Sequence, residues 1–323
     1  MKKLSKKARL RIKLYNLKQL RTEGASDINE QVSHLAMPVK ISLFNSKFRG
    51  NVLSIINKMR TKNKENKSCF IDFKKVDTLM PDGTIHFFHQ LDKYPNLSLS
   101  GRASNSNIVK GMLSKLGVHQ RMKLPSFEYK HLYVDRWYTM SGITADFGEE
   151  FVEIQNALQE VLQDEDSEFI VSTAISEAVS NVVHHGYASN DKYKKWVLFV
   201  GISNQRCDII ISDLGQTIPK TAPKTLGEKF QEAINFKWKE KSDADRIEFA
   251  ASWRQSSTND SHRGKGFDNI IQVQEVRGDT IVHILSRKGA WSTTSGKKSY
   301  SESVDGTIVY WSIPINSSLA VIA

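Results

Sequence analysis

The chain has 323 residues, 39% of them hydrophobic and 25% charged, and a formal net charge of +11. This length exceeds a typical single domain, and the apolar fraction can build a core in each half. No apolar run approaches the roughly 20 residues that cross a bilayer, and the lysine-rich start is unlike a signal peptide, so we expect a cytoplasmic protein without a membrane segment. The two cysteines, Cys69 and Cys207, lie far apart beside apolar residues, which excludes a disulfide scaffold and predicts reduced core thiols.

The N-terminal segment carries most of the positive charge. In residues 1–24, nine Lys or Arg stand against Glu23 alone, which gives +8 and leaves +3 for the rest of the chain. Leu10, Leu14 and Leu17 fall on one helical stripe among these bases, which predicts a basic amphipathic helix within residues 1–30. Such a helix either binds nucleic acid or an acidic partner or is simply a solvated face, and a transit peptide is a third alternative.

Residues 31–125 hold short apolar runs in the order strand, turn, helix, strand, helix. The residues that define these elements are Phe70, Ile71 and Phe73 for the first strand, Ile85, Phe87, Phe88 and Leu91 for the first helix, Leu97 and Leu99 for the second strand, and Val109, Met112, Leu113 and Leu116 for the second helix. This order resembles a STAS domain, the fold of anti-sigma-factor antagonists. In those antagonists the turn before the first helix carries a phosphorylatable serine, but here it reads Met80, Pro81, Asp82, Gly83. The resemblance therefore implies a degenerate STAS-like module used for contact, and a purely structural α/β layer is the alternative.

The segment ISEAVSNVVHHGY predicts a helix with an unusual polar face. At 3.6 residues per turn, Glu177, Asn181 and His185 advance by only about 40° per step, so they share one face. The carboxamide oxygen of Asn181 suits a magnesium ion that bridges phosphates, and Glu177, about one turn away, could orient or deprotonate a nucleophile. The alternative is a buried helix in which the Glu and the Asn have structural partners.

A second polar residue follows an apolar run in CDIIISDLGQTIP. The run Ile209 to Ile211 predicts a buried strand, and Asp213 falls at its end, where a carboxylate can accept a hydrogen bond from an exocyclic amine. Gly215 would allow a close ligand approach that a side chain blocks, although Asp-x-Gly is also an ordinary turn.

A glycine-rich stretch precedes a helical pattern in HRGKGFDNIIQVQEV. Gly264 and Gly266 flank Lys265 where backbone amides at a helix start can hold phosphate, but the spacing is not that of a P-loop, and these glycines could merely relax a loop. Residues 220–262 form a long stretch that is a lid, a partner surface or both. The Ser-, Thr-, Gly- and Lys-rich segment 292–303 predicts a hairpin loop.

Taken in order, these segments resemble the GHKL superfamily of ATPases over residues 130–318, and most of all the anti-sigma-factor serine kinases. In that family a Glu-x-x-x-Asn helix, an Asp-x-Gly turn, a glycine-rich lid end and a late Gly-Thr strand build the nucleotide site. The last of these is DGTIVYWSI, with Gly306 and Thr307. The expected fold class is therefore α/β: a sandwich of a mixed sheet with helices on one face, preceded by the smaller STAS-like module.

Carried over residue by residue, the resemblance implies ATP and magnesium as cofactors. Glu177 would be the catalytic base, Asn181 the magnesium ligand, and Asp213 the acceptor for the adenine amine. Thr307 would help to hold adenine through water. His185 fits the pattern without a defined role.

The resemblance also gives the glycines of these segments a role. Gly215 would let the base approach, and Gly264, Lys265 and Gly266 would close over the phosphates.

Three functions follow from these alternatives. The first is an ATP-dependent protein kinase in which Glu177 activates a hydroxyl of a partner, and the second is an ATPase switch in which water is the nucleophile. The third is a non-catalytic protein or nucleic-acid interaction module with a vestigial nucleotide site. The kinase implies a protein partner, with a STAS-domain protein as one candidate. The switch would pass its signal to the STAS-like part or to a bound partner, and each function is compatible with a homodimer.

Overall fold

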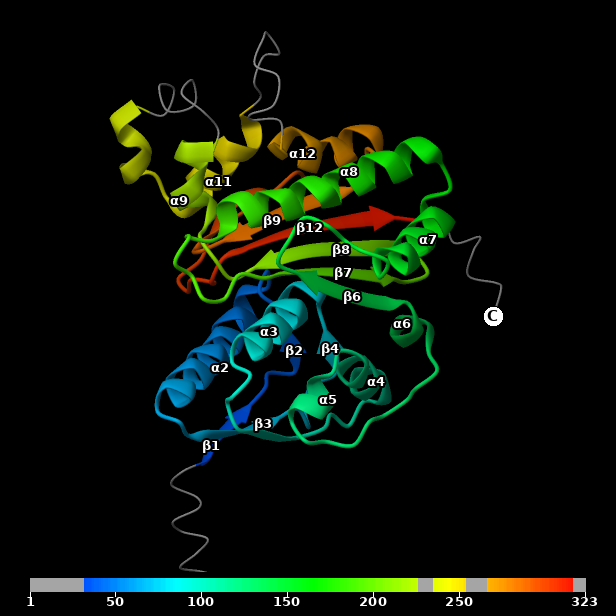
Figure 1. Cartoon of the computed structure of the whole chain (residues 1–323), viewed down its shortest axis with the longest axis vertical. Helices are drawn as coiled ribbons and strands as arrows, with labels where there is room; N and C mark the ends of the chain where they lie inside the picture. The colour runs from blue at the N-terminus through cyan, green and yellow to red at the C-terminus, as the bar shows by residue number, and fades with distance from the viewer. Residues whose placement is uncertain (1–31, 226–234, 254–265, 316–323) are drawn as a thin grey trace, which may run out of the picture.

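The computed structural model describes residues 32–225, 235–253 and 266–315 (Figure 1). The predicted basic helix within residues 1–30 lies outside these ranges, and so do Gly264 and Lys265. The expected α/β class is confirmed, because helices and strands alternate through the described chain. None of the helices in these three ranges is both long and apolar enough to cross a membrane.

The N-terminal part is a small layer of strands and helices at the bottom of Figure 1. Its elements are β1 (Val32–Ala36), β2 (Lys40–Ile41), α2 (Ser46–Lys64), β3 (Ser68–Asp72), β4 (Thr78–Leu79), α3 (Pro81–Lys93), β5 (Leu99–Arg102), α4 (Asn107–Lys115), α5 (Val118–Arg121) and α6 (Leu132–Asp135). The strands β1, β3 and β5 form a parallel sheet, because a helix crosses between each consecutive pair. The predicted order of strand, helix, strand and helix is confirmed by β3, α3, β5 and α4.

The larger part is built on a seven-stranded sheet. Its strands are β6 (Trp137–Gly142), β7 (Trp196–Ile202), β8 (Arg206–Asp213), β9 (Ile281–Ser286), β10 (Gly289–Ser292), β11 (Gly296–Ser299) and β12 (Thr307–Pro314). They lie in the order β11-β10-β9-β12-β8-β7-β6. The expectation of a mixed sheet is wrong, because every pairing between neighbours is antiparallel. The strands β8 and β9 do run parallel to each other, but β12 is inserted between them.

One face of this sheet is covered by helices that follow β6 and β8 in the chain (Figure 1). They are α7 (Phe151–Leu162), α8 (Glu165–Asn181), α9 (Ile218–Thr225), the 3-10 helix Asn235–Glu240, α11 (Asp243–Ser252) and α12 (Gly266–Val276). Helix α11 packs on β10 and buries Ile247 and Ala250 in a cluster with Ile284 of β9. This part of the stretch 220–262 is therefore a packed cover of the sheet and not a free lid.

The opposite face of the sheet is covered by the N-terminal layer. Helix α3 packs against β7, β8 and β12, and Phe87 of α3 belongs to the same core as Phe199, Ile210 and Ile308 of the sheet. The expectation of helices on one face is thus incomplete, since both faces are buried. This arrangement explains why β7 reads as a continuous apolar run without alternation.

One smaller prediction is confirmed by the fold, and a second is confirmed in part. Cys69 in β3 and Cys207 in β8 are free and buried. The segment 292–303 contains a hairpin turn at residues 293–295, across which β10 and β11 pair, but residues 296–299 of the predicted loop form strand β11.

Candidate functional site

Helix α8 presents Glu177 and Asn181 one turn apart, as the α-helical spacing predicts. Asp164 caps the start of the helix, because its side chain accepts from the backbone N–H of Ser167. Acidic residues in the first turn interact favourably with the positive end of the helix dipole. The α-helix ends at Asn181, and the chain continues as a π-helical turn over Val182–Gly186, which carries His185. π-helical turns are rare in proteins, and those that occur are often found at functional sites.

Asp213 is the last residue of β8, where the sequence places it, and only 4% of the residue is exposed. Its Oδ1 accepts from the backbone N–H of Gly215 at 2.8 Å, and the backbone amide of Thr307 also donates to the carboxylate. Burial raises the pKa of Asp213 to about 7, although both amides lower it. A carboxylate of this kind gains from any further donor that reaches it.

Two glycines, Gly306 and Gly215, let the backbone pack closely beside Asp213. Gly306 has φ of +64°, and a Cβ there would lie 2.1 Å from the carbonyl oxygen of Asp213. A Cβ on Gly215 would lie 2.0 Å from the carbonyl oxygen of Gly186, which accepts from the N–H of Gln216. The π-helical turn therefore brings Gly186 against the Asp-x-Gly turn, and none of these contacts tolerates a side chain.

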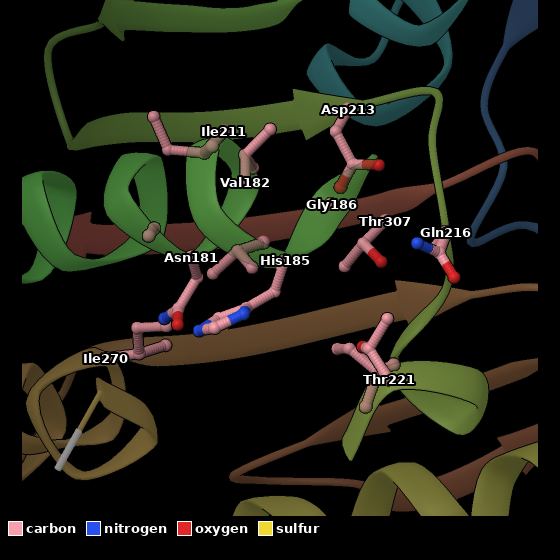
Figure 2. Close-up of a pocket in the computed structure, with 13 residues that line it drawn as sticks. Asn181, Val182, His185, Gly186, Ile211, Asp213, Gln216, Thr221, Ile270 and Thr307 are labelled. Atoms are coloured by element: carbon pink, nitrogen blue, oxygen red, sulfur yellow. The ribbon is translucent and has the colours of Figure 1, made fainter. Parts of the chain in front are cut away.

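A pocket opens beside Asp213, between α8, β8, β12 and α12. Figure 2 shows Asp213, Thr307 and Asn181 at this pocket, each from a different element. The residues that line it are Ala178, Asn181, Val182, His185, Gly186, Ile211, Asp213, Gln216, Ile218, Thr221, Ile270, Thr307 and Val309. The pocket thus has mostly apolar walls with a few polar groups, which is typical of a small-molecule site.

Asn181 has an unused hydrogen-bonding group in this pocket. Its Nδ2 is buried and has no hydrogen-bond partner among the residues that the structure describes. A buried polar atom without a partner costs free energy, so the carboxamide gains from a ligand.

The structure brings together four of the predicted site residues and leaves others apart. Asn181, His185, Asp213 and Thr307 all line the pocket. Glu177 is half-buried, burial raises its pKa, and it lies one turn from Asn181 without lining the pocket. Of the glycine-rich stretch only Gly266, the first residue of α12, lies within the described residues.

The sequence did not predict the role of Ser286, which is fully buried at the end of β9. Its hydroxyl donates to the carbonyl oxygen of Gly306 at 3.0 Å, lies 3.1 Å from Oγ1 of Thr307, and accepts from the N–H of Ile218 at 3.2 Å. A serine after the apolar run IVHIL is the only local signal, and it resembles an ordinary strand end. Through these hydrogen bonds, Ser286 connects the start of β12 with the start of α9. Both elements line the pocket.

A second, wider pocket adjoins the first at the Asp-x-Gly turn, since both are lined by Gln216. Gly215 and Gly306 line this second pocket. Its charged residues are the acids Asp191 and Asp305 and the cations Lys93, Lys192, Lys220 and Arg287. The Asp-x-Gly turn and Gly306 therefore lie between the first pocket, beside Asp213, and the second pocket, which has more basic than acidic residues.

The sequence was compared with models of known protein families and with curated protein sequences, and neither comparison found a match.

Proposed function

We propose that this protein binds ATP with magnesium in the pocket beside Asp213 and uses it to regulate a partner protein. The observation that carries this proposal is the buried Asp213 carboxylate at the edge of a pocket with apolar walls. Adenine has flat aromatic faces and an amine donor on its rim. Ile211, Val309 and Ile270 would contact the base, and Asp213 would accept from its amine.

The pocket offers an oxygen ligand for a magnesium ion that would be bound together with the phosphates of a nucleotide. Mg²⁺ keeps several waters and takes one or two protein oxygens besides phosphate, so the carboxamide oxygen of Asn181, which lines the pocket, would be enough as a protein ligand. Within the described part of the chain, no group of three or more His, Cys, Asp or Glu could hold a metal ion. When bound, the ion would neutralise charge on the transferred phosphoryl group.

Glu177 is the residue that we propose as the general base. Burial raises the pKa of its carboxyl, which makes it a better proton acceptor than an exposed glutamate. The nucleophile is water in an ATPase or a serine or threonine hydroxyl of a partner in a kinase. In either case its oxygen bonds to the γ-phosphorus, the bond to the β,γ-bridging oxygen breaks, ADP leaves, and Glu177 takes the hydroxyl proton.

The architecture is compatible with the resemblance to GHKL ATPases preceded by a STAS-like module, and we include both in the proposal. The all-antiparallel sheet departs from the expected mixed sheet. One observation favours a second candidate, nucleotide binding without turnover: Glu177 does not line the pocket.

Release of ADP from Mg-ATP by wild type, Glu177→Gln and Glu168→Gln separates the two candidates. Glu168 lies on the same helix at its other end, so its variant is the matched control. Turnover lost only in Glu177→Gln, with ATP binding retained, supports catalysis. Binding without turnover in the wild type, with and without added partner, supports the non-catalytic alternative. A parallel assay with labelled γ-phosphate detects transfer to a protein.

A further inference from the structure

Helix α3 of the N-terminal layer buries polar side chains where it packs on the seven-stranded sheet. His86, His89 and Gln90 have no exposed surface, although Phe87 and Leu91 of the same helix are ordinary core residues. Burial of three polar side chains is costly unless they have specific partners. Two of them, His89 and Gln90, have partners in segments that support the nucleotide site.

Gln90 binds the turn before β12. Its Nε2 donates to Oδ2 of Asp305 at 2.9 Å, and the guanidinium of Arg60 in α2 forms an ion pair with the same carboxylate oxygen. Arg60 is in turn held by Tyr94, whose hydroxyl accepts from its Nε at 3.3 Å. Two helices of the N-terminal layer therefore hold Asp305.

Asp305 is joined directly to the backbone that fixes Asp213. The next residue, Gly306, packs on the Asp213 carbonyl, and the amide of Thr307 donates to the Asp213 carboxylate. On the neighbouring strand, Nδ1 of His89 lies 3.3 Å from Oγ of Ser212, the residue before Asp213. Both segments that position the carboxylate are thus held by helix α3 from the opposite face of the sheet.

We propose that Arg60, Gln90 and His89 are positioning residues, which through Asp305 and Ser212 fix the Asp213 carboxylate so that the site selects a purine with an exocyclic amine. This inference rests on the proposed nucleotide site. A carboxylate held rigidly in a buried pocket rejects a base that lacks the matching donor, because its acceptor is then left unpaired. A carboxylate that can shift finds other hydrogen-bond partners, so discrimination between a base with the amine and a base without it falls. The N-terminal layer therefore determines nucleotide specificity from the far side of the sheet.

The test compares the full-length wild type with Arg60→Ala, Asp305→Ala and Asp305→Asn. Calorimetry with magnesium gives the Kd for ATP and for ITP, which has a carbonyl oxygen in place of the exocyclic amine. Arg60 and Asp305 have side chains that are 34% and 31% exposed, so their truncation leaves no large buried cavity. Asp305→Asn keeps an acceptor for Gln90. Arg136→Ala, which breaks the exposed ion pair with Glu160 elsewhere on the molecule, is the matched control.

We expect Arg60→Ala and Asp305→Ala to weaken ATP binding by about tenfold and ITP binding by less than about twofold, so that the ATP-to-ITP preference falls. Asp305→Asn should keep more of the preference than Asp305→Ala, and Arg136→Ala should keep all of it. An unchanged preference in both alanine variants overturns the inference, and so does an equal loss of both nucleotides, which indicates a merely structural role. A wild type that binds no ATP is instead a failure of the proposed function and removes the basis of the inference.

Discussion

Asp213 is a carboxylate that folding buries at the end of a strand. Burial raises its pKa from 3.8 to about 7, even though the amides of Gly215 and Thr307 favour the charged form. The carboxylate therefore destabilises the folded protein at neutral pH in the absence of a further donor. Such strongly perturbed groups in pockets are typical of functional sites.

Replacing Asp213 by asparagine is expected to stabilise the protein at neutral pH while removing nucleotide binding. The folded-state pKa lies above the ordinary value, so the stability from the protonated carboxyl is fully present below about pH 4 and is lost as pH rises through about 7. A rise of this size corresponds to roughly 4 kcal/mol, at about 1.4 kcal/mol per pKa unit. Denaturant unfolding across this pH range should show the wild type losing stability relative to Asp213→Asn. A difference that does not vary with pH contradicts a buried titrating carboxyl.

The site residues differ in how far the sequence could predict them. Asn181 and Asp213 follow from local patterns, since helical spacing and the end of an apolar run are both visible in the chain. Ser286 and Gln216 take part through hydrogen bonds to Gly306 and Gly186, which are distant in sequence. Contacts of this kind are decided by tertiary packing, so no local pattern contains them.

At the scale of elements, two short backbone segments shape the pocket. The π-helical turn Val182–Gly186 brings the Gly186 carbonyl to the Asp-x-Gly turn, and the turn before β12 places Gly306 on Asp213. The sequence predicted the helix, the strand end and the late Gly-Thr strand. It did not predict the π turn, whose Gly186 carbonyl accepts a hydrogen bond from the N–H of Gln216, a residue distant in the chain.

The turn before β12 gives a prediction with a matched control. Gly306 and Gly296 both have positive φ, at +64° and +65°, but a Cβ on Gly296 meets nothing within 4 Å. Gly296→Ala should therefore cost only the backbone strain of about 1 kcal/mol. Gly306→Ala adds a clash with Asp213 and should cost more than about 3 kcal/mol and abolish ATP binding. Denaturant unfolding measures both variants, and equal losses would show that Gly306 is not packed on Asp213.

At the scale of the whole molecule, the N-terminal layer and the seven-stranded sheet share one core. Residues of α3, such as Ile85 and Phe87, cluster with Phe199 and Ile308 of the sheet. The sequence indicated two parts of α/β type, and their elements appear in the predicted order. That the first part covers the second face of the sheet depends on long-range packing. One sequence signal is the unbroken apolar run of β7, which indicates a strand buried on both faces.

The shared core predicts that the two parts unfold together. Cys69 lies in β3 of the N-terminal layer and Cys207 in β8 of the large sheet, and neither has exposed surface. Thiol labelling in increasing denaturant should therefore modify both cysteines at the same midpoint, because exposure of one part removes the cover of the other. Modification of Cys69 at clearly lower denaturant than Cys207 would contradict a single cooperative unit.

The most direct test of the central claim is calorimetric titration of ATP with magnesium into the wild type, Asp213→Asn and Asp208→Asn. Asp208 is a carboxylate on the same strand that binds Tyr310 and Ser312 away from the pocket, so its variant controls for the loss of a charge on β8. The proposed function predicts binding by the wild type and by Asp208→Asn, and no binding by Asp213→Asn. Binding that survives in Asp213→Asn, or its absence in the wild type, would contradict an adenine site at this carboxylate.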